Sequence, residues 1–149
     1  MIISLQSPLI KFVTVVLSPL SHQAGRWIKK DESVRRYIAA RAEFLGAIRL
    51  PNDTFKGVAG TEVTSDIIFL KKRDSIRERD EDWIHLSEDE KGLVYNKYFV
   101  DHPEQVLGSM EEVSGRFGNT LACLPKENAD LKGLLTKASE GNRTKDDKV

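Results

Sequence analysis

The chain has 149 residues, and its 23 Lys and Arg are balanced by 23 Asp and Glu, so the formal net charge is zero. A length in this range favours a single domain. The charges are unevenly placed, because residues 26–77 hold 12 basic and 7 acidic side chains whereas residues 78–112 hold 3 and 11. The composition therefore excludes a uniformly basic nucleic-acid-binding protein, but it allows one basic face.

Cysteine content and hydropathy exclude further classes of protein. A single cysteine, Cys123, excludes a disulfide framework, and together with three scattered histidines it excludes a Cys-rich zinc site. No run of about 18 apolar residues is present, so we expect no membrane span. The first apolar stretch is interrupted by Lys11 and lacks an Ala-x-Ala cleavage site, which argues against secretion. We therefore expect a cytoplasmic protein with no metal and no membrane partner.

The N-terminal third is predicted to contain a strand and a helix. Residues 10–17 are rich in Val and bounded by prolines, as expected of a strand, whereas residues 18–30 have the period of neither element. Asp31 or Ser33 can cap a helix that extends to residue 45, and Gly46 stands where a glycine often ends a helix. The expected buried stripe of this helix is Val34, Tyr37, Ile38, Ala42 and Leu45, and its expected exposed face carries Arg35, Arg36, Arg41 and Glu43.

Two strands joined by a loop are predicted next, at residues 47–50 and 63–70. The uninterrupted apolar run at residues 67–70 indicates a strand that is covered on both faces. A strand, a helix, a strand, a glycine-containing loop and a further strand, in this order, predict an α/β fold.

The C-terminal half has weaker patterns. Residues 71–82 contain five basic and five acidic side chains, so we expect a solvated linker. Beyond it we predict short strands at 83–86 and 95–100, a helical turn at 103–107 closed by Gly108, a hairpin at 114–124 that turns at Gly118 and Asn119, and a helix at 128–139. The predicted organisation is an α/β core at 1–73, a charged linker at 74–82, an irregular α+β extension at 83–140 and a disordered tail at 141–149.

No self-sufficient catalytic motif is present in the chain. Neither a Gly-x-Gly-x-x-Gly, a P-loop, a Gly-x-Ser-x-Gly nor a His-Glu-x-x-His sequence occurs. His85 and His102 lack the spacing of metal ligands, and we expect them on the surface or at helix caps. Cys123 lies in an apolar run and is expected to be a buried small side chain rather than a nucleophile. We therefore assign no catalytic residue.

The loop between the two predicted strands is the candidate binding site. Phe55 can stack on a nucleobase and Lys56 can contact a phosphate. In the structural alternative, which the residues alone favour, Phe55 fills the core beneath the loop. The loop residues of interest are Pro51, Asn52, Phe55, Lys56, Gly57, Gly60 and Thr61.

This region resembles a known enzyme family. Leu50-Pro51-x-x-x-Phe55, then Gly60-Thr61, then an apolar strand ending in Lys71-Lys72-Arg73 is similar to adenine-specific DNA methyltransferases of the restriction–modification type. The likeness is greatest to helicase–methylase fusion proteins of phages and mobile elements. It extends downstream through Trp83-Ile84-His85-Leu86, residues 96–104 and residues 114–118, so it covers about residues 29–125.

The resemblance implies part of a Rossmann-like methyltransferase sheet, with the last two strands as an antiparallel pair at the sheet edge. It implies that the loop faces an adenine flipped out of DNA, with Phe55 as the target-base aromatic and S-adenosylmethionine as the cofactor of the complete enzyme. The candidate DNA-binding residues are Lys56, Arg35, Arg36 and Arg41.

The family's glycine-rich cofactor motif and its Asn-Pro-Pro-Tyr catalytic motif do not occur in this sequence. We therefore expect a fragment that binds no cofactor alone and is inactive alone. It is expected either to pair with a second polypeptide that carries the cofactor-binding half or to be a non-functional remnant. Such a partial sheet is expected to leave an open edge and one uncovered face. The alternative is a stand-alone DNA- or protein-binding module without catalytic activity.

Overall fold

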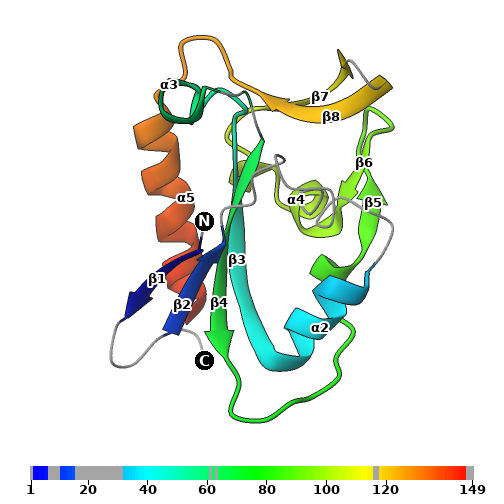
Figure 1. Ribbon diagram of the computed structural model, residues 1–149, viewed down its shortest axis with the longest axis vertical. Helices are drawn as coiled ribbons and strands as arrows, with labels where there is room; N and C mark the ends of the chain where they lie inside the picture. The colour runs from blue at the N-terminus through cyan, green and yellow to red at the C-terminus, as the bar shows by residue number, and fades with distance from the viewer. Residues whose placement is uncertain are drawn as a thin grey trace.

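The computed structural model describes residues 2–6, 11–15, 32–60, 62, 64–115 and 118–146, which form a mixed α/β chain with antiparallel sheets (Figure 1). The elements are β1 (Ile2–Gln6), β2 (Lys11–Val15), α2 (Ser33–Arg41), β3 (Ala42–Leu50), α3 (Lys56–Ala59), β4 (Ser65–Lys72), the 3-10 turn η1 (Asp82–Ile84), β5 (Leu86–Glu88), β6 (Val94–Asn96), α4 (Lys97–Asp101), the 3-10 turn η2 (Pro103–Gln105), β7 (Ser109–Gly115), β8 (Gly118–Leu124) and α5 (Leu131–Asp146).

The main sheet has the strand order β1-β2-β4-β3. The β3 and β4 strands pair antiparallel from Ala42 opposite Lys72 to Leu50 opposite Ser65, which confirms the expected antiparallel pair at a sheet edge. Because β4 is antiparallel to both of its neighbours, β2 and β3 run in the same direction on either side of it. The β5–β6 and β7–β8 pairs form two further two-stranded sheets.

The helix α2 is shorter than predicted. It ends at Arg41, and the chain passes directly into β3, so the expected helical end at Leu45 and the glycine cap at Gly46 are wrong. Gly46 instead lies in β3 beside a shift in the register with β4. Pairing with β4 satisfies the backbone groups of these residues in a strand ladder, which outweighs their local helical pattern.

The buried face of α2 also differs from the predicted stripe. Arg35 and Ala39 are completely buried, whereas Tyr37 is 60% exposed. Arg35 faces inward because its Nε donates a hydrogen bond to the carbonyl oxygen of Ile84 in η1. The expected exposed position of Arg35 and the expected buried position of Tyr37 are therefore wrong.

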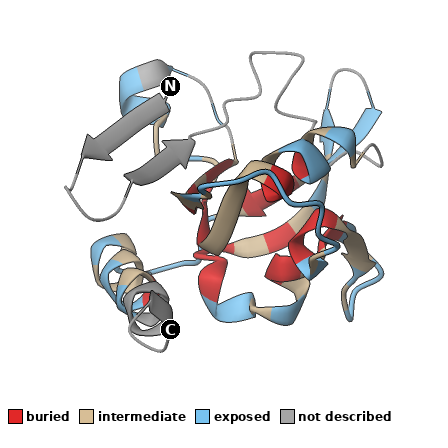
Figure 2. Ribbon diagram, turned by 90° about the horizontal axis from the view of Figure 1, so that it is seen from below, coloured by how far each residue is buried: buried red, intermediate tan, exposed pale blue. Residues whose placement is uncertain are grey.

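Both faces of the β3–β4 pair are covered. On one face, Ala47, Ile68 and Leu70 join a core that includes Trp83 and Phe99. On the other face, apolar side chains of β3 and β4 pack in one cluster with side chains of α5. Figure 2 colours the chain by how far each residue is buried. This arrangement confirms the prediction from the run at residues 67–70. It also corrects the expectation of an uncovered face, since residues C-terminal to the sheet cover it.

The segment before α4 forms elements other than those predicted. Residues 83–86 were expected to form a strand, but Trp83 and Ile84 lie in η1. Residues 95–100 were also expected to form a strand, but the strand ends at Asn96, whose side chain accepts a hydrogen bond from the Tyr98 backbone N–H and caps α4. The cap therefore starts a helix where the apolar pattern favoured continued extension.

The remaining C-terminal elements are closer to the prediction. The helical turn predicted at 103–107 is confirmed for Pro103–Gln105, which form η2, whereas Val106 is already extended. The hairpin is confirmed as β7–β8, but Gly118 and Asn119 lie within β8, and the connecting residues 116–117 are outside the described part of the chain. The helix α5 extends to Asp146, into the segment expected to be a tail.

The charged segment between β4 and η1 lies on the surface. Residues 74–80 are exposed, as expected of a solvated linker. The residues on either side of it nevertheless share one hydrophobic core, because Ala47 and Ile68 pack in the same cluster as Ile84, Phe99 and Met110. None of the helices in the described part of the chain is long and apolar enough to cross a membrane.

Candidate functional site

The loop that joins β3 to β4 is fixed to the β7–β8 hairpin. The backbone N–H of Asn52 donates to the carbonyl oxygen of Cys123 at 2.7 Å. The backbone N–H of Cys123 in turn donates to the Thr64 hydroxyl oxygen at 2.8 Å. Pro51 is buried at the start of the loop, and its carbonyl oxygen accepts a hydrogen bond from Thr54. Both ends of the loop are therefore attached to β8.

Phe55 is positioned as the structural alternative expects. Its side chain is partly buried and packs against the cluster formed by Ile48, Leu50, Leu107 and Ala138. A base that stacks on Phe55 would therefore meet only the part of the ring that this cluster leaves exposed.

The tip of the loop is the short helix α3, which presents polar and apolar side chains to solvent. The Lys56 ammonium forms an ion pair with Glu62 at 2.5 Å, and this hydrogen bond raises the pKa of Lys56. Val58 is 92% exposed, more than any other large hydrophobic side chain of the described residues. Gly60 ends α3 with a φ of +69°, a conformation that favours glycine.

Of the two remaining loop residues predicted from the sequence, Gly57 and Thr61, the structure describes only Gly57. An added side chain at Gly57 would meet no heavy atom within 4 Å, so this glycine leaves open space in front of the loop. Thr61 lies outside the described residues.

The three arginines of α2 occupy different environments. Arg35 is completely buried against η1, which removes it from any surface that DNA could contact. Arg36 is exposed and forms ion pairs with Glu32 at 2.9 Å and with Asp80 at 3.1 Å. The guanidinium of Arg41 lies over the ring of Tyr37, with 3.6 Å between Cζ and the ring centroid.

The structure does not bring the predicted DNA-binding residues together. Arg41 immediately precedes β3, and Lys56 follows the end of that strand. A strand of nine residues spans about 30 Å. The arginines of α2 and the loop therefore form two separate surfaces, one at each end of β3 (Figure 1).

His85 joins the charged segment to α2. Its Nδ1 lies 2.8 Å from a carboxylate oxygen of Glu32, and its Nε2 lies 2.8 Å from a carboxylate oxygen of Asp80. The hydrogen bond to Glu32 is the largest of the effects that raise the pKa of His85. Since Arg36 contacts the same two carboxylates, two basic and two acidic side chains form one network.

The other candidate polar residues have structural positions. His102 precedes η2 and contacts Glu104 at 3.1 Å, in agreement with its expected place at a helix start. Cys123 is completely buried, as expected, and burial raises the pKa of its thiol to about 12. The part of the chain that the structure describes contains no cluster of His, Cys, Asp and Glu suited to a metal ion.

A buried ion pair in the core was not predicted. The guanidinium of Arg49 in β3 donates to both carboxylate oxygens of Asp66 in β4, at 2.7 and 2.8 Å. The two residues are direct partners in the strand register, and Arg49 also lies 4.4 Å over the ring of Phe99. Burial has the largest single effect on the pKa of Arg49 and lowers it, but the charge and hydrogen bonds of Asp66, with smaller effects of Cys123 and Tyr95, leave the pKa raised. A charged residue in each of two neighbouring apolar strands was the signal for this pair.

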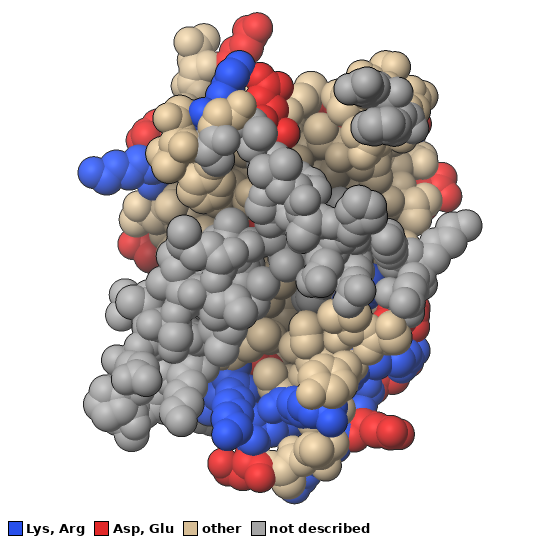
Figure 3. All heavy atoms as spheres, viewed as in Figure 1, with Lys and Arg blue, Asp and Glu red and all other residues tan. Residues whose placement is uncertain are grey.

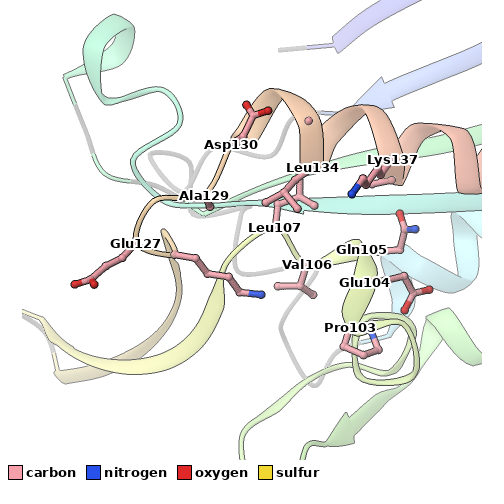
Figure 4. A pocket seen from close by; sticks show the side chains of 13 residues that line it. Pro103, Glu104, Gln105, Val106, Leu107, Glu127, Ala129, Asp130, Leu134 and Lys137 are labelled. Carbon is pink, nitrogen blue, oxygen red and sulfur yellow. The ribbon is translucent and has the colours of Figure 1, made fainter.

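A groove of about 800 Å³ lies between η2 and α5 (Figure 4). Its floor includes Val106, Leu107 and Leu134, and Glu104 and Lys137 stand at its border. None of its lining residues belongs to the loop between β3 and β4.

Comparisons with known proteins identify no relative of this chain. No protein-family model, curated protein or solved structure matches it.

Proposed function

We propose that this chain is part of an S-adenosylmethionine-dependent, adenine-specific DNA methyltransferase. In this proposal it supplies the edge of a Rossmann-like sheet and the loop on the side of the target base, and it does not methylate DNA by itself. The observation that carries the proposal is the antiparallel β3–β4 pair at the sheet edge, whose connecting loop is attached to β8 and presents Lys56 to solvent.

The chemistry of the loop suits a duplex from which one base has been extruded. An exposed ammonium can contact a phosphate, and exposed aliphatic side chains of DNA-binding proteins enter the space between base steps. Lys56 and Val58 provide these two groups, two residues apart within the single turn of α3. Glu62 competes with phosphate for Lys56, since the two side chains already form an ion pair.

The described residues do not fit S-adenosylmethionine. In open α/β sheets, such cofactors bind at the carboxyl ends of parallel strands, beside the start of a helix. The groove beside α5 is not at such a position, and a second hollow, beside α2, lies at the amino end of β3. The proposal therefore assigns the cofactor and the catalytic Asn-Pro-Pro-Tyr motif to a second polypeptide.

Fluorescence anisotropy of three labelled duplexes tests the proposal. One duplex carries an adenine opposite an abasic site, the second a thymine opposite an abasic site, and the third is fully paired. We expect both duplexes with an abasic site to bind more tightly than the paired one, because their unpaired base is already free to leave the stack, and the adenine duplex to bind most tightly, because adenine is the base that the proposed enzyme accepts. Lys56→Gln should weaken binding and reduce the salt dependence by the equivalent of about one phosphate contact.

Two variants provide matched controls. Glu62→Gln should strengthen binding, because it removes the competitor for Lys56. Lys132→Gln changes an exposed lysine on α5 and should have no effect. Absence of binding at low salt would contradict the proposal. Equal affinity for the three duplexes would also contradict it, if Lys56→Gln leaves that affinity unchanged.

The second candidate function is a stand-alone DNA- or protein-binding module. It is favoured by the exposed Arg36 and the partly exposed Arg41 on α2, which lie at the opposite end of β3 from the loop, a strand length of about 30 Å. Arg36→Ala and Arg41→Ala test it, whereas Arg35→Ala does not, because a completely buried arginine cannot be removed without loss of packing. Loss of binding in the α2 variants together with unchanged binding in Lys56→Gln would favour the module.

A further inference from the structure

The hollow beside α2 is lined by both exposed apolar and charged side chains. It has a volume of about 560 Å³ and lies between α2 and the charged segment at residues 76–80. Two of the most exposed large hydrophobic side chains of the described residues, Tyr37 and Ile76, line it at 60% and 65% exposure. The other lining residues are Ser33, Arg36, Ala40, Arg41, Glu78, Arg79 and Asp80.

A stacked pair of side chains stands at the border of this hollow. The Arg41 guanidinium lies over the Tyr37 ring at 3.6 Å and donates a hydrogen bond to the Tyr37 carbonyl oxygen at 3.1 Å. The second contact fixes the guanidinium in place over the ring. Planar aromatic rings and guanidinium groups are the surfaces on which unpaired nucleobases stack.

The charge of the hollow favours an anion. Of the charged residues that line it, Arg36 and Asp80 are bound to each other, which leaves Arg41 and Arg79 against Glu78. Among the described residues, neither Arg41 nor Arg79 forms an ion pair with a carboxylate.

Further basic residues surround the hollow. Lys72 pairs with Ala42 in the strand register, next to Arg41, and the backbone N–H of Arg77 donates to the carbonyl oxygen of Ala40. Figure 3 shows Lys and Arg side chains gathered on the lower part of the molecule, where α2 and β4 end.

The wall opposite α2 is held in place at both ends. The backbone N–H of Arg73 donates to the Arg41 carbonyl oxygen at 2.9 Å, and Asp80 is bound by Arg36 and His85. The hollow is therefore formed before any ligand arrives, which reduces the ordering cost of binding.

We propose that this hollow binds single-stranded nucleic acid. A base stacks on the Tyr37–Arg41 pair beside Ile76, and the adjoining phosphates contact Arg79 and Arg41. The inference takes from the proposed function only that DNA is the partner. It adds a second contact, for a strand displaced from the duplex, at the opposite end of β3 from the loop. The planar stacked pair favours a nucleic acid over an acidic peptide, which offers carboxylates but few planar rings.

Anisotropy of a short labelled oligothymidylate at low salt tests this inference. Tyr37→Leu keeps an exposed helical residue and should weaken binding about 5- to 150-fold, the range measured for loss of one stacked base. Arg79→Gln should reduce the slope of log affinity against log salt by about 0.7, as one lost phosphate contact on a single strand requires. Lys132→Gln is the matched control and should bind as the unaltered chain does.

The outcomes separate this inference from the proposed function. Oligothymidylate binding that depends on Tyr37 and Arg79 supports the inference, even if Lys56→Gln has no effect on duplex binding and the methyltransferase proposal fails. Wild-type affinity in both Tyr37→Leu and Arg79→Gln would overturn it. Competition by polyglutamate as effective as that by unlabelled oligothymidylate would also overturn it, and would identify the hollow as a site for acidic peptides.

Discussion

The buried pair of Arg49 and Asp66 makes a specific prediction about stability. Both side chains lie in the core, at 0% and 7% exposure, and they share two hydrogen bonds. Removal of one partner from such a pair typically costs about 3–5 kcal/mol, because the other charge stays buried without compensation. The total free energy of unfolding of a protein of this size is about 5–15 kcal/mol.

The two single variants should differ. Asp66→Leu leaves a guanidinium that remains protonated at any accessible pH, whereas Arg49→Met leaves a carboxyl group that can become neutral by binding a proton. We therefore expect Asp66→Leu to cost close to 5 kcal/mol and Arg49→Met closer to 3 kcal/mol. At about 2–4 °C per kcal/mol, the melting temperature should fall by about 6–20 °C.

The double variant completes the test. Arg49→Met with Asp66→Leu replaces the pair by apolar side chains of similar volume, so its stability should return to that of the unaltered chain or exceed it. Urea unfolding followed by circular dichroism measures all four proteins, and the cycle gives the coupling free energy. Losses below about 1 kcal/mol in both single variants would refute the reasoning, because they would mean that the pair is hydrated.

Three further predictions follow from other contacts. The pKa of His85 is raised above its ordinary value of 6.5, so the contribution of His85 to stability is complete below pH 6.5 and is lost as the pH rises through the raised pKa. The urea midpoint should therefore fall over this pH range, and His85→Gln should remove this pH dependence. Burial raises the pKa of Cys123 to about 12, so a disulfide reagent at about pH 8 should label the thiol only after unfolding, and rapid labelling of the folded chain would contradict this. A methyl group at Gly108 would collide with the Leu124 carbonyl oxygen and lie 2.7 Å from Cys123 Sγ, so Gly108→Ala should lower the free energy of unfolding by at least about 1–3 kcal/mol. A methyl group at Gly57 would meet open space, so Gly57→Ala should not lower it. Equal urea midpoints for these two variants would contradict this prediction.

The strand pair could be predicted from the sequence because its signal is local. The apolar run at residues 67–70 is too continuous for a strand with one wet face, and the structure places Ile68 and Leu70 on one face and Ile67 and Phe69 on the other. The prediction of a buried Cys123 rested on the same kind of local pattern.

The orientation of α2 could not be predicted, because its determinant is distant in the chain. Helical periodicity assigns arginine to the exposed face, but Arg35 is buried by a hydrogen bond to Ile84, 49 residues away. This burial turns Tyr37 outward and thereby forms the stacked pair with Arg41. The most distinctive surface of α2 thus depends on a tertiary contact.

The candidate site was predicted only in part for a similar reason. The loop residues were identified by their types, but their roles depend on packing. Phe55 packs into the cluster shared by β3 and α5, and Lys56 is paired with Glu62. The Arg49–Asp66 pair depends on the register between β3 and β4, which the sequence alone does not define.

The central claim is that the loop between β3 and β4 receives an adenine outside the duplex. The emission of 2-aminopurine, placed opposite an abasic site in a duplex, tests this claim most directly, since the emission responds to the stacking of that base. The account predicts an emission change that saturates as the chain is added and that requires more protein in Lys56→Gln. An emission that stays constant while anisotropy reports binding of the same duplex would contradict the account, because the chain would then hold the DNA without contacting the base.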